Sequence, residues 1–297
     1  MRIVMAGASG LLGTALGDHF RGAGHEVVRL VRRPATAPDE SQWDPDTGTV
    51  DASVIESADV VVNLAGRPLL GNVHSARWRR EVLSSRVRTT SVLAEAIAAA
   101  GTRPAYLAGN GSAYYGDHGD EVVTEDSDSR GGSFLTRVTR EWQAAAEPAV
   151  AAGARVCVLR TSPVAARSNP LYRLQIPLFR LGLGTRFGSG RQYTALISLR
   201  DWVAAVAFLA EHPTASGPFN LCCPVTPTNA GFTRELARML HRPAFLFAPA
   251  PIVRVAAGPM APEVLASMNL RPAALLREGF EFRDHDVTQV LATALTA

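Results

Sequence analysis

The sequence predicts an α/β protein built on a doubly wound parallel β-sheet, with a smaller C-terminal unit covering the edge where ligands bind. Two observations support this fold class. Short apolar runs alternate with longer amphipathic segments over roughly the first 160 residues, a pattern typical of strands that alternate with helices. Prolines and a glycine-rich stretch then follow, so a different unit is expected after that point. Right-handed βαβ crossovers bring all strand carboxyl ends to one edge of the sheet.

The elements of the first part follow from this alternation. Buried strands are expected at residues 3–6, 26–31, 60–64, 105–108 and 155–159. Helices with apolar residues three and four positions apart are expected at residues 11–23, 81–100 and 134–152.

The second part of the chain is less regular. Residues 161–200 contain Pro163, Pro170 and Pro177, and a helix is expected from Asp201 through Glu211. One more strand is predicted at residues 219–221, and three helices follow Asn229. We therefore predict a nucleotide-binding domain at residues 1–165, to which residues 195–225 return. Residues 166–194 and 226–297 are predicted to form the smaller, substrate-covering unit.

All thirty cationic side chains are arginines, set against twenty-seven acidic ones, for a formal charge of +3. Because lysine is absent, the chain cannot form a Schiff base or act as a P-loop kinase of the usual type. The arginines are scattered rather than gathered in a stripe, which argues against a nucleic-acid partner.

Cysteine, histidine and hydropathy give further bounds. Cys157, Cys222 and Cys223 form no CxxC pair, and the seven histidines are dispersed, so no metal site is expected. Residues 1–6 read as a strand rather than a signal peptide, and the apolar segment 203–210 is too short to span a bilayer. The sequence thus predicts a soluble, cytoplasmic protein without a membrane partner.

The segment between the first strand and the first helix carries a glycine triplet, Gly7, Gly10 and Gly13, with Ser9, Leu11 and Leu12 between them. Glycine allows the turn, the approach of a pyrophosphate to the backbone, and close helix–strand packing. The helix amino end then favours the anion. This arrangement predicts a Rossmann-like dinucleotide site; the competing interpretation is a tight turn that binds nothing.

Two arginines follow the second strand. An NAD-preferring site usually has an acidic residue here for the ribose 2′-hydroxyl, whereas Arg32 and Arg33 suit a 2′-phosphate. We therefore expect NADP(H), the alternative being that both arginines are solvated strand ends. Small residues after the third main strand, Leu64, Ala65 and Gly66, leave room for the cofactor's ribose and phosphates.

These segments resemble the extended, or atypical, short-chain dehydrogenase/reductase superfamily, in a poorly characterised NAD-dependent epimerase/dehydratase branch sometimes labelled cell-division inhibitor. The resemblance covers essentially the whole chain, including the C-terminal segment 242–282. Further motifs that carry it are Arg77-Trp78, residues 85–90, Glu141-Trp142, residues 177–184, residues 188–192 and residues 228–230.

The resemblance implies roles for particular residues. Gly7, Gly10, Leu11, Leu12 and Gly13 would hold the pyrophosphate. The remaining contacts would be Arg32 to the 2′-phosphate, Leu64 and Ala65 to the ribose, Glu81 and Arg86 from the following helix, and Val164 near the nicotinamide. Glu81 and Arg86 are alternatively an exposed helical pair.

The superfamily's catalytic side chains are missing. Its members carry a serine ahead of a Tyr-Gly pair, and then Tyr-x-x-x-Lys on the next helix. Here Asn110 or Gly111 falls where the serine is expected, and Ser112 is out of register. Residues 131–142 contain neither tyrosine nor lysine. The remaining candidates for catalysis are Tyr115 or Tyr114 as proton donor, helped by Arg137 or a water, together with Ser112 and Asn110.

Two functions stay open. One is an NADP(H)-dependent oxidoreductase or epimerase-like enzyme acting on an unidentified small molecule. The other is a non-catalytic NADP(H)-binding sensor or interaction module. Residues 188–192 either line the substrate cleft, with Arg191 facing an anion, or form a simple hairpin turn. A homodimer through the helices at 81–100 and 134–152 is the candidate assembly.

Overall fold

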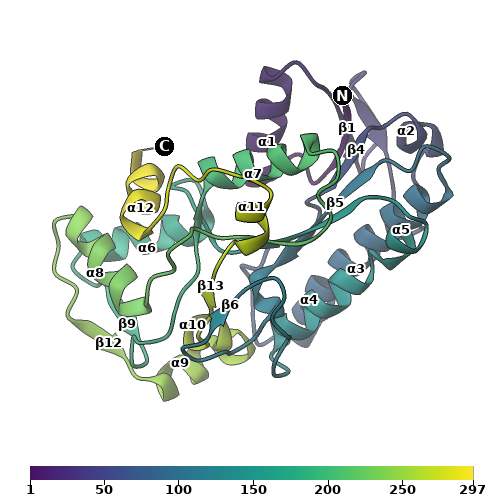
Figure 1. Ribbon diagram of the computed structural model, residues 1–297. Helices are drawn as coiled ribbons and strands as arrows, with labels where there is room; N and C mark the ends of the chain where they lie inside the picture. The colour runs from purple at the N-terminus through teal and green to yellow at the C-terminus, as the bar shows by residue number, and fades with distance from the viewer. Residues whose placement is uncertain (297) are drawn as a thin grey trace.

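A computed structural model, which describes residues 1–296, contains a seven-stranded parallel sheet with helices on both faces (Figure 1). The strand order is β11-β7-β5-β4-β1-β2-β3, so the direction of winding reverses between β1 and β4. This reversal opens a crevice at the carboxyl edge. The strands are β1 (Arg2–Ala6), β2 (Glu26–Val31), β3 (Glu40–Gln42), β4 (Val60–Asn63), β5 (Ala105–Gly111), β7 (Val156–Thr161) and β11 (Gly217–Leu221).

The predicted fold class is confirmed, and all five strands predicted in the first part are present. The strands are almost wholly apolar and lie buried, as expected when helices cover both faces of a parallel sheet. The short edge strand β3 was not predicted. Its three residues, Glu-Ser-Gln, lack the apolar character of a buried strand.

Helices pack on each face of the sheet (Figure 1). Leu16, Phe20 and Trp202 join the core on one face, from α1 (Leu11–Gly22) and α7 (Leu199–Glu211). The opposite face carries α2 (Ala52–Glu56), α3 (Ala76–Ala99), α4 (Phe134–Ala144) and α5 (Glu147–Ala151).

The helix predicted at residues 134–152 is in fact two, α4 and α5. Pro148 lies in the first turn of α5, where its missing N–H costs nothing. Within a continuous helix the same proline would remove a hydrogen bond and clash with the preceding turn. Helix α3 begins at Ala76, five residues before the predicted start, because Ser75 caps it by accepting a hydrogen bond from the Trp78 amide.

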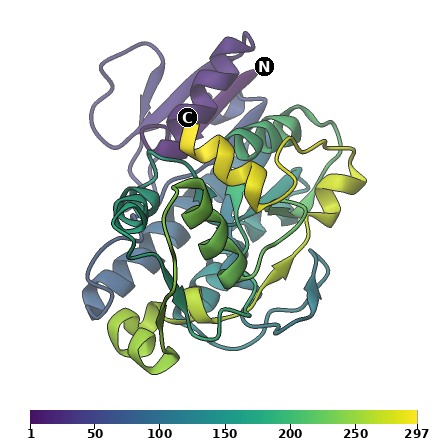
Figure 2. The same cartoon turned by 90° about the vertical axis from the view of Figure 1, so that its left-hand side faces the viewer.

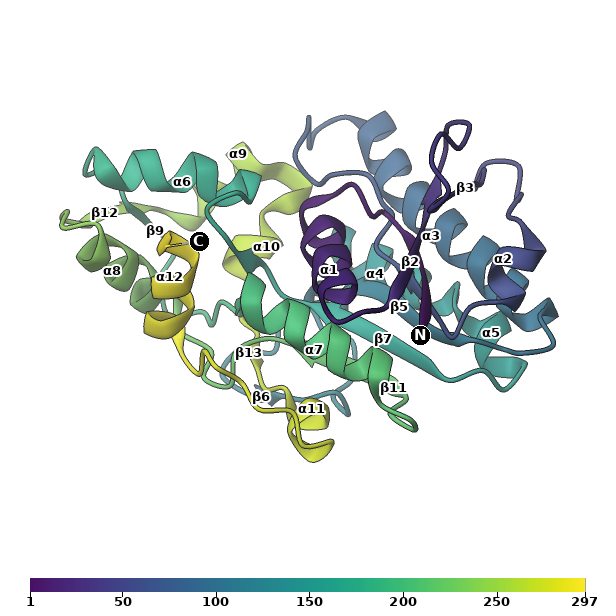
Figure 3. The same ribbon diagram turned by 90° about the horizontal axis from the view of Figure 1, so that it is seen from above.

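The smaller unit lies beside the carboxyl edge of the sheet, with helices on its outer side (Figures 2 and 3). Tyr172, Phe232 and Val290 share its own core, on α6 (Pro170–Arg180), α8 (Asn229–Met239) and α12 (Val287–Thr296). Three two-stranded parallel sheets lie apart from the main sheet: β8 (Val164–Ala165) with β10 (Ile197–Ser198), β9 (Thr185–Phe187) with β12 (Leu246–Ala248), and β6 (Val122–Val123) with β13 (Asn269–Leu270).

The C-terminal part differs from prediction in two respects. Residues 229–296 contain five α-helices instead of three: between α8 and α12 lie three short helices, each of which begins at or directly after a proline, Pro249, Pro262 or Pro272. These are α9 (Ala250–Ala257), α10 (Pro262–Leu265) and α11 (Ala273–Arg277), with a 3₁₀ turn η2 (Gly258–Met260) between the first two.

The assignment of all of residues 226–297 to the smaller unit needs correction. Helix α11 contacts β11, and Leu275, Phe280 and Phe282 join the core of the main domain. This segment therefore packs in the core of the main domain and not in that of the smaller unit. Residues 199–221 do contribute a helix and a strand to the main domain, α7 and β11.

Within the part of the chain that is described, no helix combines the length and apolar character needed to cross a membrane. Over the same residues, no three His, Cys, Asp or Glu side chains gather as a metal site would require.

Candidate functional site

The turn from β1 into α1 is built on two glycines that no other residue can replace. Gly7 has a φ of 78°, and a Cβ there would lie 2.6 Å from the Leu64 carbonyl carbon and 2.7 Å from the Ala65 nitrogen. A Cβ on the buried Gly13 would overlap the Gly7 carbonyl oxygen. These two positions therefore bring α1 against β1 and β4 at the closest distance that backbones allow.

Gly10 is less crowded than Gly7 and Gly13. A Cβ on it would meet only the Gly7 oxygen, at an ordinary 3.5 Å, and both Ser9 and Gly10 are exposed. No side chain caps α1, and the amides of Leu11 and Leu12 donate to no acceptor in residues 1–296. An open helix amino end with free amides is suited to a pyrophosphate.

The end of β4 is held by Asn63, whose side chain is fully buried. Its Nδ2 donates to Thr90 Oγ1 at 3.0 Å and to the Tyr106 hydroxyl at 3.2 Å. Its Oδ1 accepts the Ala65 amide at 3.1 Å. This fixes Leu64 and Ala65 against the glycine turn, as the ribose-lining role requires, and leaves Gly66 exposed beside it.

Arg86 lies behind this strand end and is 9% exposed, so it is not one of an exposed pair. Its Nη1 donates to the Val82 carbonyl at 3.0 Å, and its guanidinium stands 5.1 Å from the centre of the Trp142 ring. No carboxylate of the described chain pairs with it, and burial lowers its pKa to about 10. A buried, uncompensated cation next to Gly66 indicates an anionic ligand.

Glu81 behaves differently from Arg86. Its carboxylate pairs with Arg67 and Arg77, each at 2.8 Å, and the Arg77 guanidinium holds its pKa below the usual range. Glu81 therefore joins the loop after β4 to α3, and its negative charge is already neutralised by these two arginines.

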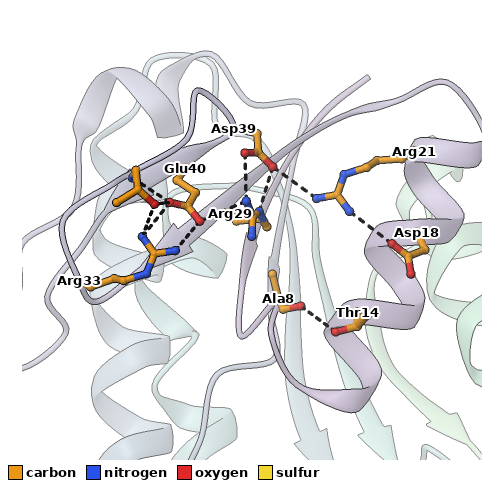
Figure 4. Close-up of polar contacts among 9 residues, drawn as sticks. Ala8, Thr14, Asp18, Arg21, Arg29, Arg33, Asp39 and Glu40 are labelled. Carbon is orange, nitrogen blue, oxygen red and sulfur yellow. Dashed lines mark hydrogen bonds and ion pairs between the residues drawn. The ribbon is translucent and has the colours of Figure 1, made fainter.

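The two arginines after β2, Arg32 and Arg33, differ in their contacts. Arg33 folds back to form a bidentate pair with Glu40, at 2.7 and 2.8 Å (Figure 4). Glu40 faces Arg29 across the β2–β3 register, and Arg33 and Thr36 hold its pKa down at about 2. A 2′-phosphate would have to compete with this carboxylate for Arg33.

Arg32, by contrast, is exposed and forms no hydrogen bond or ion pair with any described residue. Of the two predicted ligands, it is the one with a free guanidinium at the end of β2. Arg21 of α1 reaches Asp39 at 3.6 Å, which ties the β2–β3 edge to the helix that starts at the glycine turn (Figure 4).

Near the end of β5, the Asn110 side chain is hydrogen-bonded within the protein. Asn110 Nδ2 donates to the Thr139 carbonyl at 3.1 Å, and its Oδ1 accepts the Gly111 amide at 2.7 Å. Ser112 is buried at the start of the 3₁₀ turn η1 (Ser112–Tyr114). Asn110 thus joins β5 to α4, a structural use of the side chain.

Tyr115, the predicted proton donor, is fully buried. Its hydroxyl donates to Asn220 Oδ1 and accepts from Arg160 Nη1, both at 2.7 Å. Burial raises its pKa to about 12, although Arg160 acts in the opposite direction. The hydroxyl has its partners inside the protein, and this placement argues against a role in proton transfer. Tyr114 is partly exposed, and its ring packs under the Arg160 guanidinium at 3.7 Å.

Val164 was predicted to approach the nicotinamide. Its side chain is buried in the main core with Ile197 and Trp202, so only its backbone is left to face a ligand.

A cavity of about 560 Å³ lies between the turn after β5 and residues 254–268. One wall comes from the turn after β5 and the start of α4, including Ala113, Ser133 and Thr136; the other comes from residues 254–268. Two lining residues were missed from the sequence, Arg254 and Glu263. Nothing in the local pattern marks them, because each is a single charge in an Ala- and Pro-rich segment.

The chain matches known families over most of its length. Residues 3–222 match the model of the NAD dependent epimerase/dehydratase family, and residues 248–294 match a domain of unknown function, DUF1731. Epimerase family protein Mb2239 of Mycobacterium bovis is 39% identical over 295 residues, covering 99% of this chain and 97% of that protein.

Two solved structures share the fold and at least 29% of the sequence. Human epimerase family protein SDR39U1, crystallised with NADPH, superposes with a TM-score of 0.88 at 29% identity and covers 100% of this chain and 99% of that one. A nucleoside-diphosphate sugar epimerase from Corynebacterium glutamicum gives a TM-score of 0.82 at 30% identity, covering 99% of this chain and 58% of that one. The chain belongs to the NAD dependent epimerase/dehydratase family.

Proposed function

We propose that this protein binds NADP(H) along the carboxyl ends of β1, β2 and β4 and uses it to interconvert a carbonyl and an alcohol on a small molecule. The substrate would occupy the cavity under the smaller unit. The open amino end of α1 carries this proposal, because Leu11 and Leu12 present free amides beside a glycine with empty space in front of it.

Three further features favour NADP(H) as the ligand. Arg86 is a buried cation without a carboxylate, and Arg32 has a free guanidinium where a 2′-phosphate is recognised in such folds. The human relative in the comparison was crystallised with NADPH. When bound, the cofactor supplies or accepts a hydride; this chain's residues hold its phosphates and cover the substrate. The three free cysteines, all buried, agree with a reducing cytoplasm.

A second candidate is a protein that binds NADP(H) without turnover. It is favoured by one observation, the absence of both tyrosine and lysine from α4. Measuring NADPH oxidation against a panel of aldehydes, ketones, quinones and nucleotide sugars separates the two. Turnover supports the enzyme, whereas tight binding without turnover supports the sensor.

The binding site itself is tested by Arg86→Met, with Arg88→Met as the matched control. Arg88 lies on the same helix but is exposed and paired with Asp46. We expect the Arg86 variant to bind NADPH at least about tenfold more weakly while its ligand-free form unfolds no more easily, because a buried unpaired charge is removed. Unchanged NADPH affinity in that variant would refute the proposed phosphate site.

A further inference from the structure

The cavity under the smaller unit touches both segments that normally carry the superfamily's catalytic hydroxyls. Ala113 and Gly116 line it from the turn after β5, and Ser133, Phe134 and Thr136 line it from the first turn of α4. Tyr115, Ser112 and Asn110 are not among its lining residues. A substrate held there would contact the turn after β5 but not the side chain of Tyr115, the predicted proton donor.

Four charged residues line the cavity, and two of them are already occupied. Arg130 pairs with Glu121 at 3.0 Å and with Asp128 at 3.2 Å. Asp117 Oδ1 accepts the amides of Gly119 at 3.0 Å and Ser267 at 3.1 Å. Arg130 is therefore neutralised by carboxylates, and Asp117 Oδ1 is held by backbone amides that fix the wall.

The other two, Glu263 and Arg254, are free. Neither forms a hydrogen bond or an ion pair with any residue in the described part of the chain. Glu263 is partly buried and Arg254 is exposed. Burial is what raises the pKa of Glu263, to about 7, with no contribution from a neighbouring charge. Glu263 and Arg254 form no ion pair with each other, although both line the cavity.

The segment that carries Glu263 is held at both sides of the cavity. Gln192, from the turn after β9, donates to the Val264 carbonyl at 2.9 Å. The Ser267 carbonyl accepts the His118 amide at 3.0 Å, and the Ser267 hydroxyl accepts the Tyr193 amide at 3.0 Å. The glutamate therefore belongs to a fixed wall. Residues 188–192, including Arg191, are not among the lining residues; Gln192 supports the wall from behind through Val264.

We propose that Glu263 is the proton donor to the carbonyl oxygen of a substrate bound in this cavity, and that Arg254 pairs with an anionic group on the same substrate. This inference rests on the proposed NADP(H)-dependent function. In the direction of reduction, the carboxyl O–H bond breaks as the substrate oxygen takes the proton, while the carbonyl carbon gains the hydride from NADPH. The products are the alcohol, NADP⁺ and the Glu263 carboxylate, which recovers a proton from water.

This assignment gives the site an acid suited to neutral pH. A proton donor works best when its pKa lies near the working pH, and burial raises the pKa of Tyr115 to about 12, far above it. A carboxyl withdrawn from water reaches the same range by a different route. The substrate class that follows is a carbonyl compound that carries a carboxylate or phosphate.

The test uses the full chain with NADPH and the variants Glu263→Gln and Arg254→Gln. Glu281→Gln is the matched control, because Glu281 is exposed and lies outside the cavity. Aldehydes, ketones and quinones are offered as matched pairs of a carboxylate and its methyl ester. We expect Glu263→Gln to lower kcat at least about 100-fold at unchanged NADPH affinity and to remove the fall in rate above neutral pH. Arg254→Gln should raise KM for the carboxylates at least about tenfold and leave the esters unaffected.

A second measurement does not depend on turnover. In ligand-free protein labelled at the glutamate side-chain carboxyl carbon, one NMR resonance should titrate near pH 7 and vanish in Glu263→Gln but persist in Glu281→Gln. Full activity of Glu263→Gln with an unchanged pH profile, or a Glu263 carboxyl that titrates in the ordinary range, would overturn the role while leaving the proposed function intact. Wild-type protein that binds NADPH but reduces no member of the panel would overturn the reaction and the role together.

Discussion

The turn after β1 and the turn after β5 lie at the same edge of the sheet, yet they are built from different materials. The first is made of backbone: Gly7 and Gly13 allow close approach, and the amides of Leu11 and Leu12 are left free. The second is made of side chains that are already bonded, with Asn110 joined to α4 and Tyr115 joined to β7 and β11.

The contrast shows what binding a pyrophosphate and transferring a proton each require of the protein. Holding a pyrophosphate needs only a backbone of the right shape, so a site of this kind is complete before the ligand arrives. Moving a proton needs a side chain that the protein has not used for itself. At the turn after β5, Asn110 and Tyr115 are already hydrogen-bonded within the protein, and the unpaired carboxyl lies on the opposite wall of the cavity, at Glu263.

The largest expected effect comes from the backbone turn. Gly13→Ala should destabilise the fold by about 4 kcal/mol or more, or prevent folding, because its Cβ overlaps backbone that cannot move. Gly10→Ala should fold normally and bind NADPH at least about tenfold more weakly, since only the ligand meets that methyl group.

Gly22→Ala is the control for both, because it lies on the same helix with nothing within 4 Å of the new Cβ. Thermal unfolding and NADPH titration provide the two readouts. A Gly10→Ala protein with full NADPH affinity would contradict the proposed pyrophosphate site, because the open space beside Gly10 would then not be where the cofactor binds.

The second effect is on stability as a function of pH. The folded pKa of Glu263, about 7, exceeds its ordinary value of 4.5, so between these values the folded protein holds a proton that the unfolded chain has lost. Stability therefore falls as the pH rises through this window. Glu263→Gln should be more stable than the wild type above pH 7, by roughly 1–3 kcal/mol, and equal to it below about pH 4.5.

Denaturant unfolding at several pH values measures this difference, with Glu281→Gln as the reference. If the difference in unfolding free energy between Glu263→Gln and the wild type did not depend on pH, the Glu263 carboxyl would not be desolvated in the folded protein.

The third expected effect is that of removing the Tyr115 hydroxyl at the turn after β5. Tyr115→Phe leaves Asn220 Oδ1 without its hydrogen-bond donor and removes one of the acceptors of Arg160, which keeps Gln143, so the change should cost about 1–3 kcal/mol of stability. NADPH affinity and kcat should stay near those of the wild type. Loss of turnover at full stability would instead restore Tyr115 as the proton donor, contrary to its placement.

The smallest effect concerns the arginines after β2. Arg32→Ala should weaken NADPH about tenfold and leave NADH unchanged, because only the 2′-phosphate meets this guanidinium. Arg33→Ala should affect the β2–β3 edge through Glu40 and change the NADPH/NADH ratio less. Equal loss of both cofactors in Arg32→Ala would contradict an NADP(H) preference.

The parallel sheet, all of its strands except the edge strand β3, and the glycine turn could be predicted from the residues alone. These depend on local patterns: apolar runs of strand length, amphipathic runs of helix length, and glycines at positions where a Cβ has no space. The sequence also showed that α4 lacks the superfamily's tyrosine and lysine, because the absence of a residue type needs no coordinates.

Only the tertiary structure decided which polar side chains are free. Arg32 and Arg33 are neighbours in sequence, yet a carboxylate seven residues further on engages one and leaves the other. Tyr115 is bonded to Asn220, and the free carboxyl comes from Glu263; both lie more than a hundred residues away from the turn after β5. Such pairings depend on which strands and helices meet in space, and no local pattern of residues records that.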